Sequence, residues 1–354
     1  MKPMLATKTR NHEEESISSM RPIRTRLAIT VASFGAVLAA TLLLAPVVGS
    51  THVSIRGAFD RTIPFADNLD AQIFFIARLP RVVAAALVGG SLAAAGVVFQ
   101  ALLRNPLASP DTLGVSSGAA LGAMAAITFH LDVPLLGLPA VPLSSVIGSL
   151  GALGVVYALA TARRRGLSTT VLLLAGVTMT AFLTALILFT QYLADFADTF
   201  RTVRWLMGTL DVGGYAPIVA VLPMLVVALG LFASLPRALD LISFGEQAAA
   251  SRGVNVVRAE RMALVSASLA TGAAVAIGGP IGFIGIIVPH LVRLLVGSDH
   301  RLVLPASILF GAAFLIACDV VARTVFAPLE VPVGVITALI GGPFFLWLLV
   351  RSSR

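Results

Sequence analysis

Long uncharged stretches alternate with short polar segments along most of the chain. The hydrocarbon core of a bilayer is about 30 Å thick and a helix crosses it with about 20 residues, so each such stretch predicts one membrane span. A longer apolar region, 262–297, divides into two spans, and the single spans are 27–49, 82–103, 113–129, 144–162, 169–194, 215–235, 302–322 and 331–350. We therefore expect an all-α integral membrane protein with ten transmembrane helices.

The division of the long region rests on its glycines and prolines. Residues 262–292 carry no charge, exceed the length of one span and contain the sequence Gly278-Gly279-Pro280. Proline removes a helix hydrogen-bond donor, so at membrane depth the freed backbone groups need partners from neighbouring helices or a water-lined cavity. We expect helix breaks at Gly278 to Pro280 and at Pro289. They suggest a moving part or a pathway, although a proline-kinked structural span is an equally good interpretation of this stretch alone.

The ends of the chain are polar and flank one continuous domain. We expect residues 1–26 to form a disordered cytoplasmic tail, 27–350 a single ten-span domain and 351–354 a cytoplasmic C-terminus. The first apolar run, 27–49, is longer than the apolar core of a cleaved signal peptide, so it predicts an uncleaved span. Residues 50–77 predict an extramembrane loop with at most a short helix.

The positions of lysine and arginine predict the orientation. Ten spans place both termini on one side, and a cytoplasmic N-terminus puts 18 of the 25 lysines and arginines on the inner side. Cytoplasmic loops carry an excess of these residues, so this orientation is favoured. A single span across 262–297 would instead move Arg301, Arg351 and Arg354 outside.

Composition supports the membrane class and argues against several functions. With 58% hydrophobic and 12% charged residues, the chain lies outside the usual range of soluble domains. The net charge of +8 does not indicate nucleic-acid binding, because the basic residues lie between apolar runs. The single cysteine, Cys318, excludes an intrachain disulfide. With Arg293 counted at the inner side, Asp319 is the only charged residue within a span proper, and Arg323 four residues later favours a local ion pair over a proton relay.

The residues of a membrane enzyme or of an ATPase are also missing from the sequence. The five histidines are scattered, and neither an H-E-x-x-H motif nor paired carboxylates occur. A Walker A loop needs a lysine, but the only lysines are Lys2 and Lys8. We expect no catalytic residue, no metal site and no cofactor on this chain. If ATP drives it, another subunit binds ATP and Mg²⁺.

A cytoplasmic helix is expected in the long polar loop 236–261. Ser243 and Glu246 have the spacing of a capping box, three alanines follow, and Gly253 can end a helix in the left-handed conformation. This predicts a helix of about nine residues within 243–253. From spacing alone it is either an ordinary loop helix or a docking point for another subunit.

Small residues recur at every fourth position in two of the expected spans. This spacing lets helix backbones approach closely in lipid and predicts a compact bundle. The residues are Ala86, Gly90 and Ala94 in one span and Gly114, Gly118 and Gly122 in the next.

Eight motifs follow one another along the chain from about Arg78 to the C-terminus. They are RLPR (78–81), ALLRNPLASPDTLGVSSGAALG (101–122), LSTTVLLLAGV (167–177), GEQAAASRGV (245–254), GGPIGFIGIIVPHLVRLL (278–295), GSDHR (297–301), DVVAR (319–323) and PVGVITALIGGPFFLWLL (332–349). In these motifs and their order the chain resembles the FecCD family, the permease subunits of ATP-binding-cassette (ABC) importers for ferric siderophores, haem and cobalamin.

The resemblance implies a ten-span permease of the bacterial cytoplasmic (inner) membrane. It implies a homodimer that assembles with two ATPase subunits and one extracytoplasmic binding protein. It further implies that a coupling helix with Gly245, Glu246, Ala249 and Gly253 contacts the ATPase. Arg78, Arg81 and Arg323 match outer-surface arginines that pair with glutamates of the binding protein, and charged rims of this kind steer docking.

The resemblance also implies a cytoplasmic gate. In cobalamin-transporting members of the family, the pathway closes at positions that match Asn105 and Leu107 and, on the fifth span, Thr169 and Thr170. The cobalamin-type sequence LSTS reads LSTT here (167–170). The pathway is expected to follow the two-fold axis of the dimer, so that each gate residue contributes twice.

The expected function is import of a metal chelate, driven by ATP hydrolysis on a separate subunit. Ferric siderophore is the first candidate on the breadth of the family, and haem and cobalamin are alternatives. An ion-coupled secondary transporter is the alternative from another class, favoured only if no ATPase associates.

Overall fold

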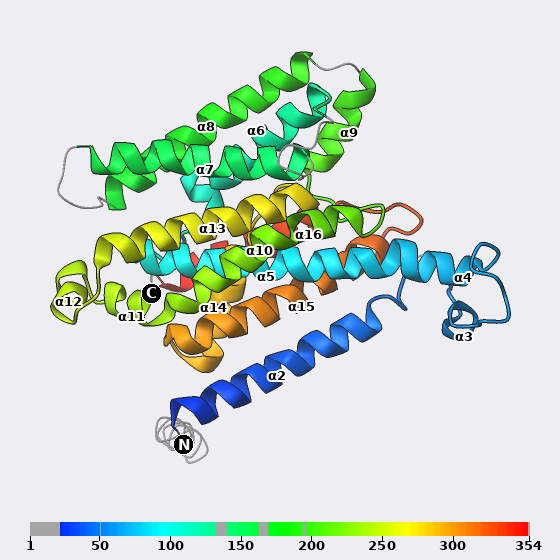
Figure 1. The fold of residues 1–354 in the computed structure, drawn as a ribbon, viewed down its shortest axis with the longest axis horizontal. Helices are drawn as coiled ribbons and strands as arrows, with labels where there is room; N and C mark the ends of the chain where they lie inside the picture. Colours follow the sequence, from blue (N-terminus) through cyan, green and yellow to red (C-terminus); the bar gives the residue numbers. More distant parts are fainter. Residues whose placement is uncertain (1–21, 50, 132–139, 163–168, 194–195, 353–354) are drawn as a thin grey trace.

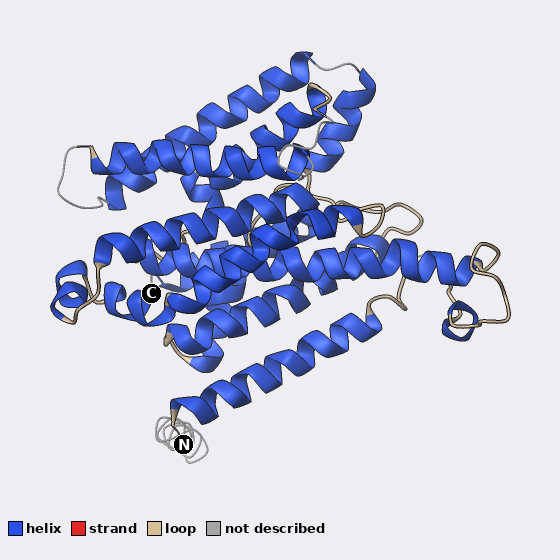
Figure 2. Cartoon of the chain, in the orientation of Figure 1, coloured by secondary structure: helices blue, strands red, loops and turns tan. Residues whose placement is uncertain are grey.

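The computed structural model describes residues 22–49, 51–131, 140–162, 169–193 and 196–352. These residues form helices joined by loops, and no strand occurs among them (Figure 2). This confirms the expected all-α architecture.

Each of the ten expected spans is a helix. Seven of them are long and apolar enough to cross a membrane, with the second lengthened outward to Leu69, and α6, α14 and α16 are shorter apolar helices. The ten are α2 (Ile23–Leu44), α5 (Leu79–Leu103), α6 (Val115–Thr128), α7 (Ala140–Thr161), α8 (Thr169–Leu193), α10 (Ala216–Ser234), α13 (Val256–Gly278), α14 (Ile284–Val296), α15 (His300–Thr324) and α16 (Val333–Ser352).

The first and last helices differ in extent from the sequence prediction. Most of the expected tail, 1–26, lies outside the described residues, but α2 already begins at Ile23. The helix ends at Leu44, ahead of the predicted end of the span, because Pro46 follows and has no N–H to continue it. At the other end, α16 continues to Ser352. The start of α2 and the end of α16 lie at the same end of the bundle (Figure 1). An even number of spans requires this arrangement.

The loop predicted at 50–77 contains more helix than expected. It holds α3 (Ile55–Ala58) and α4 (Leu69–Gln72), and η1 (Ile73–Arg78), a π-helical segment, joins α4 to α5 without a gap. Phe59 contacts Phe74 and Phe75 edge to face, with ring centroids 5.6 and 5.3 Å apart. This aromatic cluster holds the outer loop against the extended helix.

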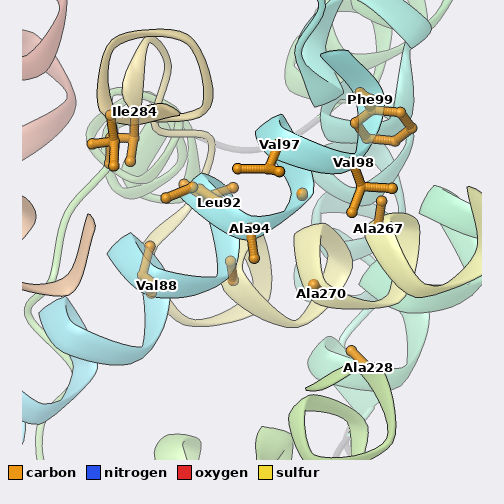
Figure 3. Packing of buried hydrophobic residues seen from close by; sticks show 14 of the residues in the cluster. Val88, Leu92, Ala94, Val97, Val98, Phe99, Ala228, Ala267, Ala270 and Ile284 are labelled. Carbon is orange, nitrogen blue, oxygen red and sulfur yellow. The ribbon is translucent and has the colours of Figure 1, made fainter. Parts of the chain in front are cut away.

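The bundle is organised around α5, which packs against α13, α14 and α15 (Figure 1). Figure 3 shows α5 residues such as Val97 and Leu92 among side chains of the neighbouring helices. Glycines bring the backbones close, since a Cβ at Gly96 would lie 2.0 Å from the carbonyl oxygen of Gly285. The predicted close packing at Gly118 is confirmed in the same way against Gly148 of α7.

Two other parts of the bundle lie on opposite sides of this centre. Helices α6, α7 and α8 pack on one another, together with α9 (Phe196–Leu206), a helix that we did not expect from the sequence (Figure 1). On the far side, α2 packs against α15.

The predicted break at Gly278 to Pro280 is confirmed. Helix α13 ends at Gly278, whose carbonyl oxygen accepts a hydrogen bond from the Thr209 amide at 2.9 Å. Gly279 has φ +68°, and a Cβ there would lie 2.2 Å from the carbonyl oxygen of Trp205. Glycine is therefore required at this turn, both for its conformation and for the close approach.

The predicted break at Pro289 is wrong. Helix α14 runs through this proline from Ile284 to Val296. Proline leaves the carbonyl four residues earlier without a helical donor, here that of Gly285. The side chain of Gln100 on α5 donates to this oxygen at 2.9 Å and supplies the missing bond. A partner from a neighbouring helix thus lets the helix continue.

Candidate functional site

At the outer end of the bundle, five charged residues form what we call the outer charge cluster: Arg78, Arg81, Asp319, Arg323 and Glu330. Arg81 bridges two carboxylates, with Nε 2.9 Å from Asp319 Oδ1 and Nη1 2.6 Å from Glu330 Oε2. Arg323 Nε lies 3.3 Å from Asp319 Oδ2, which confirms the predicted ion pair within α15. Arg81 therefore connects the start of α5 to the end of α15 and to the loop that follows it.

Two of the three predicted docking arginines are not exposed, contrary to the expectation of an outer surface. Arg78 is 6% exposed and Arg323 is 3% exposed. Arg78 Nη1 donates to the carbonyl oxygens of Pro46 and Val47, both at 3.0 Å, and Arg323 Nη2 donates to that of Ala45 at 2.7 Å. These carbonyls follow the C-terminus of α2, where no helical donor remains and a cation is favourable. The two guanidinium groups thus cap α2.

A cavity of about 410 Å³ opens beside this cluster. Its wall carries the guanidinium groups of Arg78, Arg81, Arg323 and Arg204, and the carboxylates of Glu330 and Asp211. Arginines outnumber carboxylates on the wall, and Asp319 behind it is 1% exposed. The cavity is therefore suited to receive an acidic group from outside.

At the cytoplasmic end, the helix predicted within 243–253 is present but shorter than expected, and another short helix precedes it. In chain order they are α11 (Pro236–Ser243) and α12 (Glu246–Ser251). The capping-box prediction is wrong, because Ser243 ends α11 and its hydroxyl donates to the Asp240 carbonyl at 2.7 Å. Gly245, at φ +116°, precedes α12 instead. The predicted left-handed glycine after the helix is confirmed, with Gly253 at φ +82°.

Helix α12 has one buried face and one open side. Ala249 is fully buried in a small apolar cluster with Ile242 and Ala259. Glu246, in contrast, is exposed, and no atom lies within 4 Å of a Cβ built at Gly245 or Gly253. The helix is thus anchored on α11 and α13 while its glycine ends remain accessible.

An ion pair that the sequence did not reveal joins α12 to the end of α5. Arg104 Nη2 lies 3.6 Å from Glu246 Oε1. Arg104 has a left-handed backbone conformation, φ +50°, where the chain leaves α5 for the predicted gate. The basic R-N-P sequence after a span is a signal for a helix end, but nothing in it indicates this partner.

The predicted gate residues are distributed over two segments. Asn105 follows α5 directly, and its Oδ1 accepts a hydrogen bond from the Leu107 amide at 2.9 Å. Thr169 and Thr170 begin α8. Two turns farther on, α8 contacts η2 (Pro110–Leu113), the short helix that follows the Asn105 segment, and a Cβ at Gly176 would lie 2.4 Å from the Thr112 carbonyl oxygen.

A second cavity, of about 580 Å³, lies beside the Asn105 segment at the cytoplasmic end, and Arg104, Arg293 and Asn105 line it. On its wall, Asp240 Oδ1 lies 2.6 Å from His300 Nδ1 and accepts the His300 amide at 2.9 Å. Burial raises the pKa of the Asp240 carboxyl, but the hydrogen bonds from His300 outweigh it and hold that pKa below its ordinary value. Asp240 is thus an anionic link between α11 and α15.

Comparison with known proteins agrees with this geometry. The FecCD transport family matches residues 37–351. The chain is 46% identical to the cobalamin import system permease BtuC of Halobacterium salinarum, over 77% of this chain and 72% of that protein. It is 39% identical to the hemin transport system permease HmuU of Yersinia pestis, over 88% of this chain and 94% of that protein.

A solved structure is similar as well. It is described as an inward-facing conformation of a metal-chelate type ABC transporter. It superposes with a TM-score of 0.76 and 30% identity, over 92% of this chain and 99% of that one. The chain therefore belongs to the FecCD transport family, as a multi-pass membrane permease subunit of an ABC importer for metal chelates.

Proposed function

We propose that this permease imports an iron chelate, with a ferric siderophore as the first candidate, from an extracytoplasmic binding protein into the cytoplasm. It acts as a homodimer with two ATPase subunits. The observation that carries this proposal is the family match across all but the first part of the ten-helix body. ATP and Mg²⁺ bind to the ATPase, and this chain provides the pathway.

The choice of an iron chelate rests on the breadth of the family. The hemin permease aligns at 39% identity over 94% of its own length, and the cobalamin permease aligns at 46% identity over 72% of its own length. Among iron chelates, the breadth of the family favours a ferric siderophore, and haem and cobalamin are the alternative cargoes.

The exposed faces of two helices support a homodimer. Helix α8 buries only Leu172, Gly176, Leu183 and Ile187 among its residues, which form one stripe, and apolar side chains such as Leu174 and Phe182 on the rest of its surface are exposed. Trp347 on α16 is exposed as well. Large exposed apolar surfaces mark contacts with lipid or protein. A two-fold axis along these helices brings the Thr169 and Thr170 of both protomers to the pathway, where they and the Asn105 and Leu107 segment form its cytoplasmic gate.

Helix α12 is our candidate for contact with the ATPase. Its exposed Glu246 and open glycine ends can enter a cleft of a partner, while its buried Ala249 keeps the helix attached to the bundle. The ion pair between Glu246 and Arg104 connects α12 to the residue directly before Asn105, so a movement of α12 is transmitted to the segment that begins there. ATP-driven motion at α12 thereby reaches the gate.

For docking of the binding protein, we propose that a carboxylate of that protein takes the place of Glu330 as an ion-pair partner of Arg81. Glu330 is 36% exposed and holds Arg81 from the solvent side. A glutamate of the binding protein can replace Glu330 there, while Arg78 and Arg323 supply positive potential from behind. Charge complementarity of this kind raises the association rate and sets the register of the complex.

Purification of the tagged chain in mild detergent, followed by mass spectrometry of the proteins that remain bound, tests the importer assembly. We expect a P-loop ATPase at equal stoichiometry. A well-folded dimer that retains no ATPase would contradict the proposal and favour an ion-coupled transporter. Uptake of ferric siderophore, haem and cobalamin into cells that carry the full importer then identifies the chelate, and cobalamin as the sole cargo would overturn the choice of iron.

The docking proposal has a test of its own. Replacement of Glu330 by alanine removes the internal competitor for Arg81, so we expect the permease to bind the binding protein at least as tightly as before. Arg81→Glu should abolish binding without loss of the ATPase. Normal uptake in Arg81→Glu would remove the docking role from this residue.

A further inference from the structure

Helix α2 is the most loosely packed long helix in the described part of the chain. Only Thr30 and Phe34 of its residues are buried, and its main contact is with α15. Figure 1 shows it along the edge of the bundle, inclined away from the other helices at its cytoplasmic end.

A groove of about 490 Å³ runs between α2, α10 and α15 at this end. Its walls are almost entirely aliphatic and aromatic. Apolar lining residues include Leu27 and Val31 from α2, Phe232 from α10, and Leu304 and Ile308 from α15. An acyl chain suits such a groove, because each CH₂ group that it buries against apolar side chains contributes about 0.8 kcal/mol.

Two arginines, Arg24 and Arg301, line the groove where it meets the cytoplasmic surface. Arg24 is exposed and forms no ion pair with any carboxylate that the structure describes. Arg301 directs Nε to Asp299 Oδ1 at 3.1 Å, which leaves its two terminal nitrogens for another acceptor. With Asp299 included, the entrance retains a net positive charge. It can therefore hold a phosphate group.

The depth of the groove matches the cytoplasmic leaflet. Its α2 wall extends from Ile23 to Val31. These nine residues are separated by eight helical rises and span about 12 Å of helix axis, against about 15 Å for half of the hydrocarbon core. The arginines thus lie at headgroup level while the apolar wall lies at the level of the acyl chains.

We propose that this groove is a binding site for an anionic phospholipid of the cytoplasmic leaflet. One acyl chain lies between α2, α10 and α15, and the headgroup phosphate and its additional negative charge contact Arg24 and Arg301. Basic pockets between transmembrane helices on the cytoplasmic side select anionic lipids in this way. A second groove beside α2 is less suited, because Arg26 is the only arginine among its described lining residues and already donates to the Val296 carbonyl at 3.1 Å. The proposal is independent of the transported chelate.

Native mass spectrometry of the full-length chain in mild detergent tests the site, with phosphatidylglycerol or phosphatidylcholine as the added lipid. We expect the wild type to retain phosphatidylglycerol in preference to phosphatidylcholine. The double variant Arg24→Gln/Arg301→Gln should lose about thirtyfold in apparent affinity for phosphatidylglycerol, as each arginine near an anionic headgroup contributes a similar share. The matched control Arg258→Gln removes an exposed cytoplasmic arginine outside the groove and should change nothing.

A second variant tests the apolar part and keeps both arginines. Ala233→Trp fills the groove wall on α10 and should weaken retention of phosphatidylglycerol even though the charges remain. Equal binding of the two lipids to the wild type would overturn the proposal. So would full retention of phosphatidylglycerol in Ala233→Trp or in the double arginine variant, or an equal loss in Arg258→Gln.

Discussion

The side chain of Gln100 on α5 donates a hydrogen bond of 2.9 Å to the carbonyl oxygen of Gly285 on α14. This carbonyl lies four residues before Pro289, which has no N–H to donate to it. The Oε1 of the same side chain accepts a hydrogen bond from Arg293, four residues after the proline. One residue of the central helix thus supports α14 on both sides of its proline.

We therefore expect Gln100→Leu to destabilise the permease. The variant keeps the volume of the side chain but leaves the buried Gly285 carbonyl without a donor and Arg293 without its acceptor. A buried unpaired polar group costs about 1–3 kcal/mol. Thermal unfolding of the purified chain in detergent measures the loss.

The double variant with Pro289→Ala provides the control. Alanine at 289 restores the helical N–H for the Gly285 carbonyl, so Gln100→Leu should cost about 1 kcal/mol less in this background than in the wild type. An identical cost in both backgrounds would contradict the assigned role of Gln100.

Two glycines of α7, Gly148 and Gly151, have different surroundings, so replacement by alanine should have opposite effects on stability at the two positions. A Cβ at Gly148 would lie 2.1 Å from the carbonyl oxygen of Gly118 on α6, whereas nothing lies within 4 Å of one at Gly151. Gly148→Ala should destabilise by about 1–3 kcal/mol, because the two helices must move apart. Gly151→Ala should be neutral or stabilise by up to about 1 kcal/mol through helix propensity. Melting temperatures of the two variants, measured side by side, check this difference, and equal values would refute it.

The outer charge cluster predicts that its two carboxylates differ in importance for stability. Asp319→Ala removes the partner of Arg323 and one partner of Arg81 from a site that is 1% exposed, and breaking a buried pair costs about 3–5 kcal/mol. Glu330→Ala affects an exposed pair and should cost less than about 1 kcal/mol. Expression level and thermal stability of both variants test the order, and a larger loss for Glu330→Ala would contradict it.

The ion pair between Arg104 and Glu246 predicts an effect on coupling with little effect on stability. Both side chains are about two-fifths exposed, so either alanine variant should change stability by less than about 1 kcal/mol. Chelate uptake per ATP hydrolysed should fall in both variants, because α12 loses its link to the gate segment. The measurement that checks this is the ratio of uptake to ATP hydrolysis in proteoliposomes that contain the permease and the ATPase, supplied with the binding protein.

Exchange of the two charges, in Arg104→Glu/Glu246→Arg, provides the matched control for this prediction. It should recover part of the uptake per ATP, since the pair can form again in reverse. Two single variants with unchanged ratios would show that the pair is structural only.

The hydrophobic pattern of the sequence determined the ten helices and their order. This succeeded because a bilayer demands about 20 apolar residues for each crossing. The excess of arginine on one side predicts the orientation of the chain without reference to packing. The break at Gly278 to Pro280 was also readable, since glycine and proline act on their own backbone. The family motifs added the role of a permease.

Only the tertiary structure decided which polar groups have partners within the chain. Pro289 predicted a break, but Gln100, far away in sequence, supplies the missing donor. Arg78 and Arg323 were expected on an exposed outer rim, but both are buried because they donate hydrogen bonds to the carbonyls that follow α2. Ser243 and Glu246 have the spacing of a capping box, but α11 continues to Ser243, and Gly245 is the residue that precedes the next helix. The outcomes at Pro289 and at Arg78 and Arg323 depend on partners that lie in other elements of the fold, about which a local pattern in one chain segment contains no information. At Ser243, the spacing of a capping box fits equally well with a serine that ends the preceding helix and bonds within it.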